Sequence, residues 1–441
     1  MIGLSLVFIA LAFCFSRLIE SKFSALISLI IVSSVVLVCW NSVYQPVPTS
    51  DYKVIWEGAH QIIDGSFYER AIDKSDYYAF YSFQIPYTYY ISLLLRLNDS
   101  VTTLIISEII VIVITNVLVF KTLGLYCELK AAFFGAILFS VFPYIVIGSG
   151  IINNHHIGTL FGVLAIYLTL RMNTIIKFVL AGCALVIGNL FRPTIIMIFI
   201  AIAFVLFLQG FLDKKKWIGL LIFLAVYIGL YELINLAFIG LSLAPYGIKG
   251  GDMYFKLLLG LTGSGVTNTA TTDAEHTNLY YDLQFYHFDY AKYKEASKQY
   301  LLTKILKGEL DYSYIWNKIK LFISGIDNQF VYSGTSFNEN HKTFMECLNF
   351  GGLLMYLIAI MGSFINTLRQ KTIIKNSSFF IPAIVFCAFF GVYCFIEVQT
   401  RYRYEQYICL FLLSMPFLYD VLEELTRLIK SRNPFCKREK I

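Results

Sequence analysis

The chain has 441 residues, of which 58% are hydrophobic and 15% are charged, and its formal net charge is +6. A typical soluble domain is about half apolar and about a quarter charged. These values exclude a soluble enzyme, a disordered protein and a secreted disulfide scaffold. The nine cysteines are scattered, and none has the CxxC or Cys/His spacing of a metal site. A charge balance of this kind gives no reason to expect a nucleic-acid partner, because in membrane proteins the charge of each loop matters more than the sum.

Apolar stretches of about 17 to 25 residues, the length that crosses a bilayer as a helix, recur along the chain. Because an open chain satisfies its own backbone in lipid only as a helix, each stretch is predicted to be a transmembrane helix. The sequence therefore predicts an all-α polytopic membrane protein with about 11 transmembrane helices. The predicted spans are 2–19, 23–43, 101–120, 131–148, 156–170, 175–190, 194–210, 217–239, 346–368, 378–396 and 404–422.

These spans divide the chain into six regions. They are two N-terminal transmembrane helices (1–43), an outside loop with interfacial helices (44–100), a six-helix transmembrane region (101–239), a large outside loop of mixed helix and coil (240–345), three C-terminal transmembrane helices (346–425) and a basic tail (426–441). Lys and Arg concentrate in alternate connections and in the tail, which predicts that this side is cytoplasmic. Arg192, Arg401 and Arg403 depart from this rule, because they lie in predicted outside connections.

The first outside loop carries an acidic residue next to a predicted interfacial helix. Asp51 follows the end of the second span within a few residues, and apolar residues then recur at helical spacing over 52–64 until Gly65 ends the helix. The apolar stretch 84–97 is too short to cross a bilayer. It predicts a second interfacial helix whose tyrosines, Tyr87 among them, lie in the headgroup layer.

Polar residues also gather at three later connections. The stretch 175–210 is too long for one span, so we expect it to fold back at Arg192-Pro193. Between two other spans, His155 and His156 follow Asn153 and Asn154 in a small polar cluster. In the large loop, helices are predicted over 289–307, ended by Gly308, and from Asp311 as N-cap to about Ser324.

Several of these segments resemble the GT-C superfamily of membrane glycosyltransferases, in particular bacterial mannosyltransferases and family 39. Ser50-Asp51-Tyr52, the segment from Ala59 to Tyr68 and Ile85-Pro86-Tyr87 are similar to the opening loop of these enzymes. Residues 189–194 (NLFRPT) resemble their Arg-Pro turn, 397–404 (EVQTRYRY) their Glu-x-x-x-Arg-Tyr stretch, and 257–275 a Gly-rich segment of Gram-positive relatives. The chain differs from protein O-mannosyltransferases, which carry an adjacent Asp-Glu pair where Asp51 is followed by Tyr52.

The resemblance implies an enzyme that transfers a sugar from a polyprenyl-phosphate carrier to a glycan, lipid or protein acceptor of the bacterial cell envelope. It also implies that the active site lies on the extracytoplasmic side of the plasma membrane. In such a transfer the acceptor hydroxyl loses a proton, for which a carboxylate can be the base, and cations stabilise the departing phosphate. Asp51 is the expected base or acceptor-orienting carboxylate. The residues expected at the donor phosphate are Arg401, Arg403, Arg192 and His155, supported by Glu397, Tyr402 and His156.

Other interpretations of these residues remain open at this level. Asp51 could cap the helix over 52–64, Arg192 could anchor a hairpin tip by snorkelling, and Arg401 and Arg403 could form an interfacial ion pair with Glu397. His155 could instead assist protonation or lie in the headgroup region.

No metal site is predicted, because adjacent histidines rarely point the same way and no carboxylate lies within 149–156; a divalent cation remains an open alternative as cofactor. The alternative functions are an envelope polysaccharide polymerase or ligase that uses lipid-diphosphate glycans, and a transporter or flippase. The polymerase or ligase would not need the Asp51 loop, and the transporter would place charged or broken helices near mid-membrane.

Overall fold

The computed structural model describes residues 2–44, 47–73, 76–171, 174–249, 257, 290–308, 313–325, 339–369, 380–396 and 400–432. Within these ranges every regular element is helical. The first part of the chain forms α1 (Ile2–Arg17), α2 (Lys22–Val43), α3 (Asp51–Asp64), α4 (Phe67–Ile72), α5 (Tyr77–Phe80), the 3-10 helix η1 (Ser82–Gln84), α6 (Ile85–Leu97), α7 (Val101–Leu123), α8 (Leu129–Ser140), α9 (Pro143–Gly148) and α10 (Asn154–Arg171). The second part forms α11 (Ile176–Phe191), η2 (Pro193–Ile195), α12 (Ile196–Gly210), α13 (Lys215–Gly240), α16 (Tyr290–Lys307), α17 (Ser313–Ser324), α18 (Glu339–Arg369), α19 (Ile381–Phe395), η5 (Thr400–Arg403) and α20 (Tyr404–Arg432).

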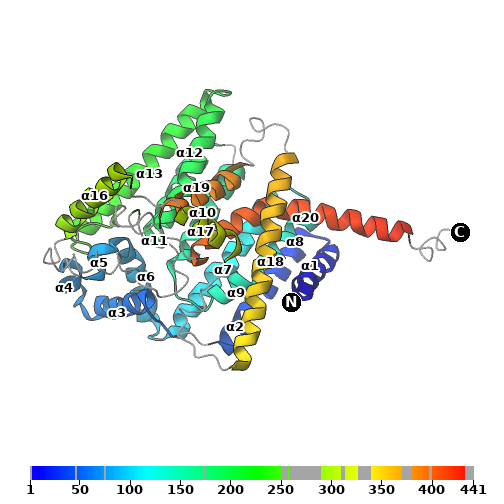
Figure 1. Cartoon of the computed structure of the whole chain (residues 1–441), viewed down its shortest axis with the longest axis horizontal. Coiled ribbons are helices and arrows are strands. Elements are labelled where there is room, and N and C mark those ends of the chain that lie inside the picture. The colour runs from blue at the N-terminus through cyan, green and yellow to red at the C-terminus, as the bar shows by residue number, and fades with distance from the viewer. Residues whose placement is uncertain are drawn as a thin grey trace.

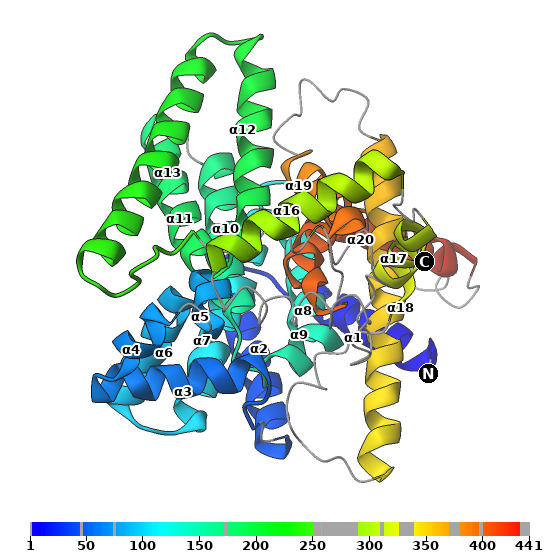
Figure 2. The same cartoon turned by 60° about the vertical axis from the view of Figure 1, so that its left-hand side comes forward.

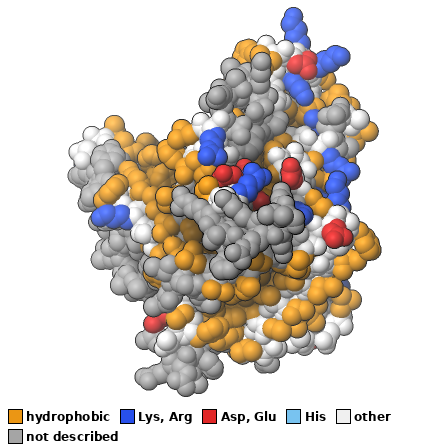
Figure 3. All heavy atoms as spheres, turned by 90° about the vertical axis from the view of Figure 1, so that its right-hand side faces the viewer, with side chains coloured by type: hydrophobic (Ala, Val, Ile, Leu, Met, Phe, Trp, Pro, Cys, Tyr) orange, Lys and Arg blue, Asp and Glu red, His pale blue; other side chains and the backbone are white. Residues whose placement is uncertain are grey.

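The helices confirm the predicted all-α polytopic membrane class. A helix lies in each predicted span, and α12 and α13 run side by side as neighbouring antiparallel helices (Figures 1 and 2). Within the described ranges, five helices are long and apolar enough to cross a membrane: 22–43, 101–123, 193–210, 215–240 and 343–369. Shorter apolar helices lie in α1, α8, α11 and α19. Figure 3 shows hydrophobic side chains over wide areas of one face, as expected of a surface in contact with lipid.

Two helices differ from the predicted spans. The predicted span 131–148 is two helices, α8 and α9, which are separated at Val141 and Phe142. The break precedes Pro143, which has no N–H to donate and disfavours the helical conformation of the residue before it. Helix α20 continues to Arg432, so part of the predicted tail is helical, and this end of the helix projects from the body of the molecule (Figure 1).

The two predicted interfacial helices, α3 and α6, form at the expected places. Gly65 ends α3 in a left-handed conformation with φ of 84°, as predicted. Their apolar faces pack together and against α7, since Ile55 and Ala59 of α3 lie in one buried cluster with Tyr87 of α6. Tyr87 is fully buried in protein, so its side chain does not face the lipid headgroups, and its depth in the membrane stays a prediction. Figures 1 and 2 show α3 to α6 gathered at one side of the molecule.

Small residues bring α10 and α11 close together. Gly158 and Gly162 lie one turn apart on α10. Gly162 faces α12, because a β carbon there would lie 2.6 Å from Cδ1 of Ile198. A β carbon at position 188 on α11 would lie 3.1 Å from the carbonyl oxygen of Gly158. Small residues at this spacing allow backbones to approach in membrane helices. The approach places the C-terminal end of α11 against the first turn of α10.

The contacts show which helix ends lie together at each end of the bundle. If successive spans run in opposite directions, as predicted, the start of one helix lies beside the end of another. Contacts among the starts of α10 and α20 and the end of α11 define one end. At the other end, Arg17 of α1 pairs with Glu423 of α20 at 3.8 Å, Lys130 of α8 donates to the Arg17 carbonyl, and Arg369 of α18 lies over the Phe417 ring. Arg17, Lys130 and Arg369, three of the residues assigned to the cytoplasmic side by charge, therefore lie near one another.

The described part of the large loop confirms the first of the two predicted helices there. Helix α16 ends before Gly308, which has a φ of 68°. Helix α17 ends at Ser324 as predicted. Asp311, its predicted N-cap, and the stretch 258–289 lie outside the described residues.

Candidate donor-phosphate site

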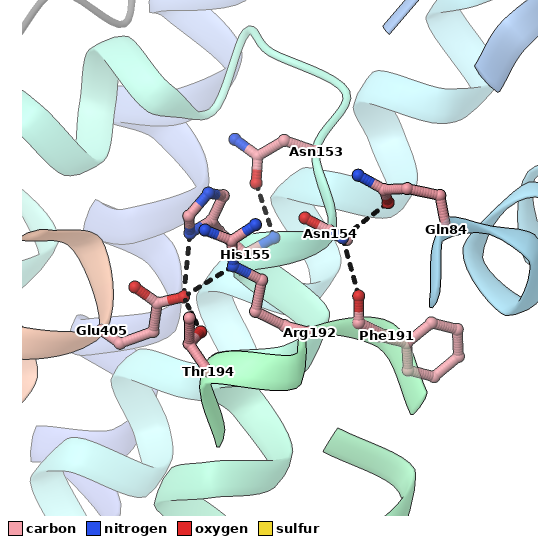
Figure 4. A network of polar contacts seen from close by, with 8 residues as sticks. All are labelled: Gln84, Asn153, Asn154, His155, Phe191, Arg192, Thr194 and Glu405. Carbon is pink, nitrogen blue, oxygen red and sulfur yellow. Dashed lines mark hydrogen bonds and ion pairs between the residues drawn. The ribbon is translucent and has the colours of Figure 1, made fainter. Parts of the chain in front are cut away.

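A buried carboxylate joins three elements at one end of the bundle. Glu405 lies in the first turn of α20, and its side chain is fully buried. Its Oε1 accepts hydrogen bonds from Nδ1 of His155 at 2.9 Å, from Nε of Arg192 at 3.2 Å and from the Thr194 hydroxyl at 3.0 Å. Figure 4 shows the three side chains converging on this oxygen. The cluster therefore links α10, the turn after α11, and η2 to the start of the last span.

Backbone and side-chain contacts position the helix ends that carry His155 and Arg192. Asn153 accepts a hydrogen bond from the backbone N–H of His155 and so starts α10. The Asn154 side chain donates to the carbonyl of Phe191 at 2.7 Å and to the Gln84 side chain at 2.8 Å. These contacts hold the start of α10, the end of α11 and η1 in one arrangement (Figure 4).

The predicted Arg-Pro turn forms, and it directs Arg192 inward. Arg192 is the C-cap residue of α11, Pro193 opens η2, and the Arg192 side chain is only 12% exposed. Its guanidinium lies over the ring of Tyr402 at 5.5 Å. A β carbon at Gly158 would lie 2.5 Å from Cβ of Arg192, so only glycine fits there. The alternative that Arg192 snorkels at a hairpin tip is therefore wrong.

A second buried histidine–glutamate pair lies beside the first. His156 contacts Oε2 of Glu108 through Nδ1 at 2.6 Å, and the Tyr87 hydroxyl donates to Oε1 of the same carboxylate at 2.8 Å. The His156 ring packs edge-on against Tyr404, at 4.7 Å between ring centroids. The adjacent histidines thus turn to different carboxylates, one on α20 and one on α7.

Tyr77 and Gln84 connect the region of Asp51 to this end of the bundle. Burial raises the pKa of Tyr77 well above its usual value, and the negative charge of Asp51 raises it further, which indicates that the carboxylate lies near the phenol. Tyr77 also hydrogen-bonds with the side chain of Gln84, which in turn accepts the hydrogen bond from Asn154. Polar contacts therefore lead from Tyr77 through Gln84 to Asn154, the residue before His155, and Asp51 lies close enough to Tyr77 for its charge to act on the phenol.

The backbone at Asp51 is unusual. Asp51 is the first residue of α3, and the N-cap position belongs to Ser50, whose side chain makes no capping hydrogen bond. The interpretation of Asp51 as the N-cap residue is therefore wrong. Ser50 has φ of 52° and ψ of −133°, a conformation that residues with a side chain rarely adopt. Strained backbone of this kind concentrates at functional sites.

Arg403 occupies a different, structural position. The residue is fully buried, and its guanidinium donates to the carbonyls of Phe322 at 3.2 Å and Gly325 at 2.8 Å at the end of α17. The guanidinium also lies 4.7 Å from the centroid of the Tyr356 ring and 5.6 Å from that of Tyr144. These contacts hold α17 against α18 and α20.

Of the remaining predicted residues, the structure describes the side chain of Tyr402 but not those of Arg401 and Glu397. Tyr402 stacks on His155, with 6.4 Å between ring centroids and 24° between ring planes. Arg401 belongs to η5, but its side chain lies outside the described residues, as does Glu397. Among the described residues, no group of three or more His, Cys, Asp or Glu side chains is placed to hold a metal ion.

Sequence reasoning missed two buried carboxylates at this end of the bundle, Glu405 within the candidate site and Glu108 beside it. Glu108 carried a signal, because an isolated ionisable residue stands out in an apolar span. Glu405 follows the Arg-Tyr stretch directly, but the prediction named Glu397, at the start of that stretch, as the supporting carboxylate. The role of Thr194 has no signal in the sequence, because it depends on the turn at Pro193.

The comparisons with known proteins agree with this architecture. The sequence profile of the family described as dolichyl-phosphate-mannose-protein mannosyltransferase matches residues 85–231, which are 147 of the 441 residues. No curated protein matches the chain. The match begins at α6 and includes α7, the two histidines and the Arg-Pro turn.

The solved structures that resemble the chain include an archaeal oligosaccharyltransferase from Archaeoglobus fulgidus. Its crystal structure with a tethered acceptor peptide containing the NVT sequon has a TM-score of 0.53 and 15% identity, covering 96% of this chain and 52% of the other. The complex of the A. fulgidus enzyme AglB with an inhibitory peptide and a dolichol-phosphate has a TM-score of 0.51 and 14% identity, covering 94% and 53%. The apo form gives 0.51 and 16%, covering 93% and 52%. The chain therefore spans about half the length of these proteins.

Together these findings show which fold the chain shares with known proteins. The chain shares the fold of the A. fulgidus oligosaccharyltransferase over nearly its whole length, and the mannosyltransferase family model matches one third of it. The predicted resemblance to the GT-C superfamily is confirmed.

Proposed function

We propose that the chain is a glycosyltransferase that transfers a sugar from a polyprenyl-phosphate carrier to a cell-envelope acceptor. The observation that carries the proposal is the pairing of Arg192 and His155 on one buried carboxylate, Glu405. Two nitrogen-bearing side chains held at the ends of membrane helices suit a ligand whose charged phosphate lies at the membrane surface while its tail stays in lipid. The carboxylate of Asp51, at the start of α3, suits the acceptor.

Each residue has a defined part in the proposed transfer. The carboxylate of Asp51 accepts the proton of the acceptor hydroxyl as that oxygen attacks the anomeric carbon. The bond from the sugar to the lipid phosphate breaks, and the phosphate leaves with an additional negative charge. Arg192 and His155 stabilise this charge through hydrogen bonds. Arg401 remains a predicted further contact, whereas Arg403 is left out because its guanidinium is fully buried in protein.

The comparisons support the donor class. The profile match is to a family whose description names a dolichyl-phosphate sugar, and one A. fulgidus structure contains a dolichol-phosphate. Both lipids are polyprenyl monophosphates. The A. fulgidus complexes hold peptides, so a protein acceptor stands beside glycan and lipid acceptors in the proposal.

The proposed orientation follows from the distribution of charge. The opposite end of the bundle carries Arg17, Lys130 and Arg369, and the positive-inside rule assigns that end and the C-terminus to the cytoplasm. The candidate site then lies on the extracytoplasmic side of the plasma membrane.

Substitution of Asp51 tests the proposed base. We expect Asp51→Asn to lower transfer at least about 100-fold, since general-base catalysis contributes about 10²–10⁴-fold, while thermal unfolding stays unchanged. Asp64→Asn is the matched control, because Asp64 lies at the exposed end of the same helix and contacts only Ser66 within the described residues. Full transfer by Asp51→Asn would remove Asp51 from the mechanism. Repeating the assay with a chelator decides whether a divalent cation takes part.

A further inference from the structure

We propose that Glu405 is the positioning residue of the donor-phosphate site, orienting Arg192 and His155 toward the phosphate without contacting the substrate. This inference rests on the proposed function and deepens it. It assigns the task of organising the site to a residue of the last span that no motif singled out.

The hydrogen bonds to Glu405 fix the state of its partners. An ionised carboxylate can only accept hydrogen bonds, so Nδ1 of His155 carries a proton and donates it to Oε1. Because the two ring nitrogens point in different directions, Nε2 of His155 then faces away from Glu405. Glu405 thereby selects both the tautomer and the orientation of the ring, as carboxylates do for histidines in metal sites.

Arg192 is held in a way that leaves its terminal nitrogens for a ligand. The contact to Glu405 uses Nε, and the guanidinium plane rests on the Tyr402 ring. Within the described part of the chain, the two Nη groups of Arg192 make no hydrogen bond. Two parallel Nη donors match the geometry of a phosphate.

The carboxylate of Glu405 can accept more hydrogen bonds than the structure gives it. All three donors meet Oε1, and Oε2 of Glu405 is buried with no hydrogen-bond partner among the described residues. A buried negative charge with one bare oxygen is maintained only where nearby cations compensate it. The charge of Glu405 therefore ties Arg192 and His155 in place more firmly than a neutral acceptor would.

The neighbouring pair Glu108–His156 provides a matched control. Glu108 is also buried and also accepts from a histidine Nδ1, but its other donor is the Tyr87 hydroxyl and not an arginine. Disrupting Glu108 disturbs a buried His–Glu contact of the same kind beside the site, without touching Arg192. A merely structural role for Glu405 predicts the same effects from both carboxylates.

The test measures binding of undecaprenyl phosphate to the full chain in nanodiscs. We expect Arg192→Ala and Glu405→Gln each to weaken binding about tenfold, a typical loss when a supporting partner is removed. The double variant is expected to lose less affinity than the sum of the two single losses, because part of the effect of Glu405 acts through Arg192 and only the part that acts through His155 remains. Glu108→Gln should lower thermal stability while leaving this affinity unchanged.

Three results would overturn the inference. Binding by Glu405→Gln that is unchanged, or tighter because a negative charge is gone, excludes positioning. Additive losses in the double variant show that Glu405 acts independently of Arg192. If Glu405→Gln does not fold, Glu405→Asp replaces it, since the shorter side chain keeps the charge but withdraws the oxygen; wild-type affinity in that variant also excludes positioning.

The same experiment separates this inference from the proposed function. If the wild-type chain does not bind undecaprenyl phosphate, the proposed donor class fails and the inference fails with it. If the wild-type chain binds and Arg192→Ala weakens binding while Glu405→Gln does not, only the inference fails.

Discussion

Gly158 offers a sharp test of how the site is built. A β carbon at this position would lie 2.5 Å from Cβ of Arg192, whereas nonbonded carbons settle at about 3.5–4.0 Å. Gly158→Ala therefore requires a shift of about 1 Å. The obstacle is attached directly to the backbone of the α11 C-cap, so side-chain rotation cannot relieve it. The end of α11 has to move away from α10, and it carries Arg192 away from Glu405.

The magnitude follows from two opposing effects. Overpacking of a close contact costs about 1–3 kcal/mol, while replacing a helical glycine by alanine gains up to about 1 kcal/mol. The net expectation is a loss of about 1–2 kcal/mol in the free energy of unfolding. The contact between Arg192 and Glu405 is already 3.2 Å long, at the upper end of ordinary hydrogen bonds, so it should break. Binding of undecaprenyl phosphate should weaken with it.

Gly229 on α13 is the matched control, because a β carbon there meets no atom within 4 Å. We expect Gly229→Ala to be neutral or slightly stabilising. Thermal unfolding of both variants in the same detergent or nanodisc provides the comparison. Equal stabilities of the two variants, together with unchanged phosphate binding by Gly158→Ala, would refute the close-packing explanation.

Three further outcomes are expected. Ser50→Gly should raise the free energy of unfolding by about 1 kcal/mol, because glycine adopts the positive φ of this residue without strain; a lower stability, measured by thermal unfolding, would contradict this. Burial lowers the pKa of His60, but hydrogen bonds to the Trp56 carbonyl and to Asp99 raise it above its usual value overall. The contribution of this exposed pair, up to about 1 kcal/mol, should be complete below the usual histidine pKa and be lost as pH rises through the raised value. Asp99→Asn should reduce that pH dependence of unfolding, because the hydrogen bond to the Trp56 carbonyl remains. Arg403→Met should remove the hydrogen bonds to the carbonyls of Phe322 and Gly325. The Phe322 carbonyl keeps its hydrogen bond from the Tyr356 hydroxyl, so the expected loss is about 1–3 kcal/mol for the Gly325 carbonyl. The variant should melt below the wild-type chain, whereas an unchanged melting temperature would show that Arg403 does not hold α17.

The sequence predicted most of the fold because the signals are strong. Long apolar stretches predict the positions of the helices, because a backbone in lipid has to satisfy its own hydrogen bonds. The Arg-Pro pair predicts a turn, and Gly65 predicts a helix end. The partner of each helix was harder to predict. The apolar face of α3 was assigned to the membrane interface, yet it packs against α6, because hydrophobic periodicity shows that a face is buried but not what covers it.

The candidate site was predicted only in part. Arg192 and His155 stood out from their connections, and the structure brings them together on one carboxylate. Glu405 could not be chosen over Glu397 from the sequence, since the choice depends on where the last helix begins. Arg403 shows the opposite problem. A basic residue at a helix opening suggests a ligand, but tertiary packing buries this one among aromatic rings and carbonyls.

The most direct test of the central claim is a transfer assay with the purified chain in nanodiscs and paired donors. One set carries a sugar on polyprenyl monophosphate and the other carries a glycan on polyprenyl diphosphate, and the released lipid phosphate is quantified for the wild-type chain and for Asp51→Asn. The account predicts release from a monophosphate donor by the wild-type chain alone. Release only from diphosphate donors, or equal release by Asp51→Asn, would contradict it.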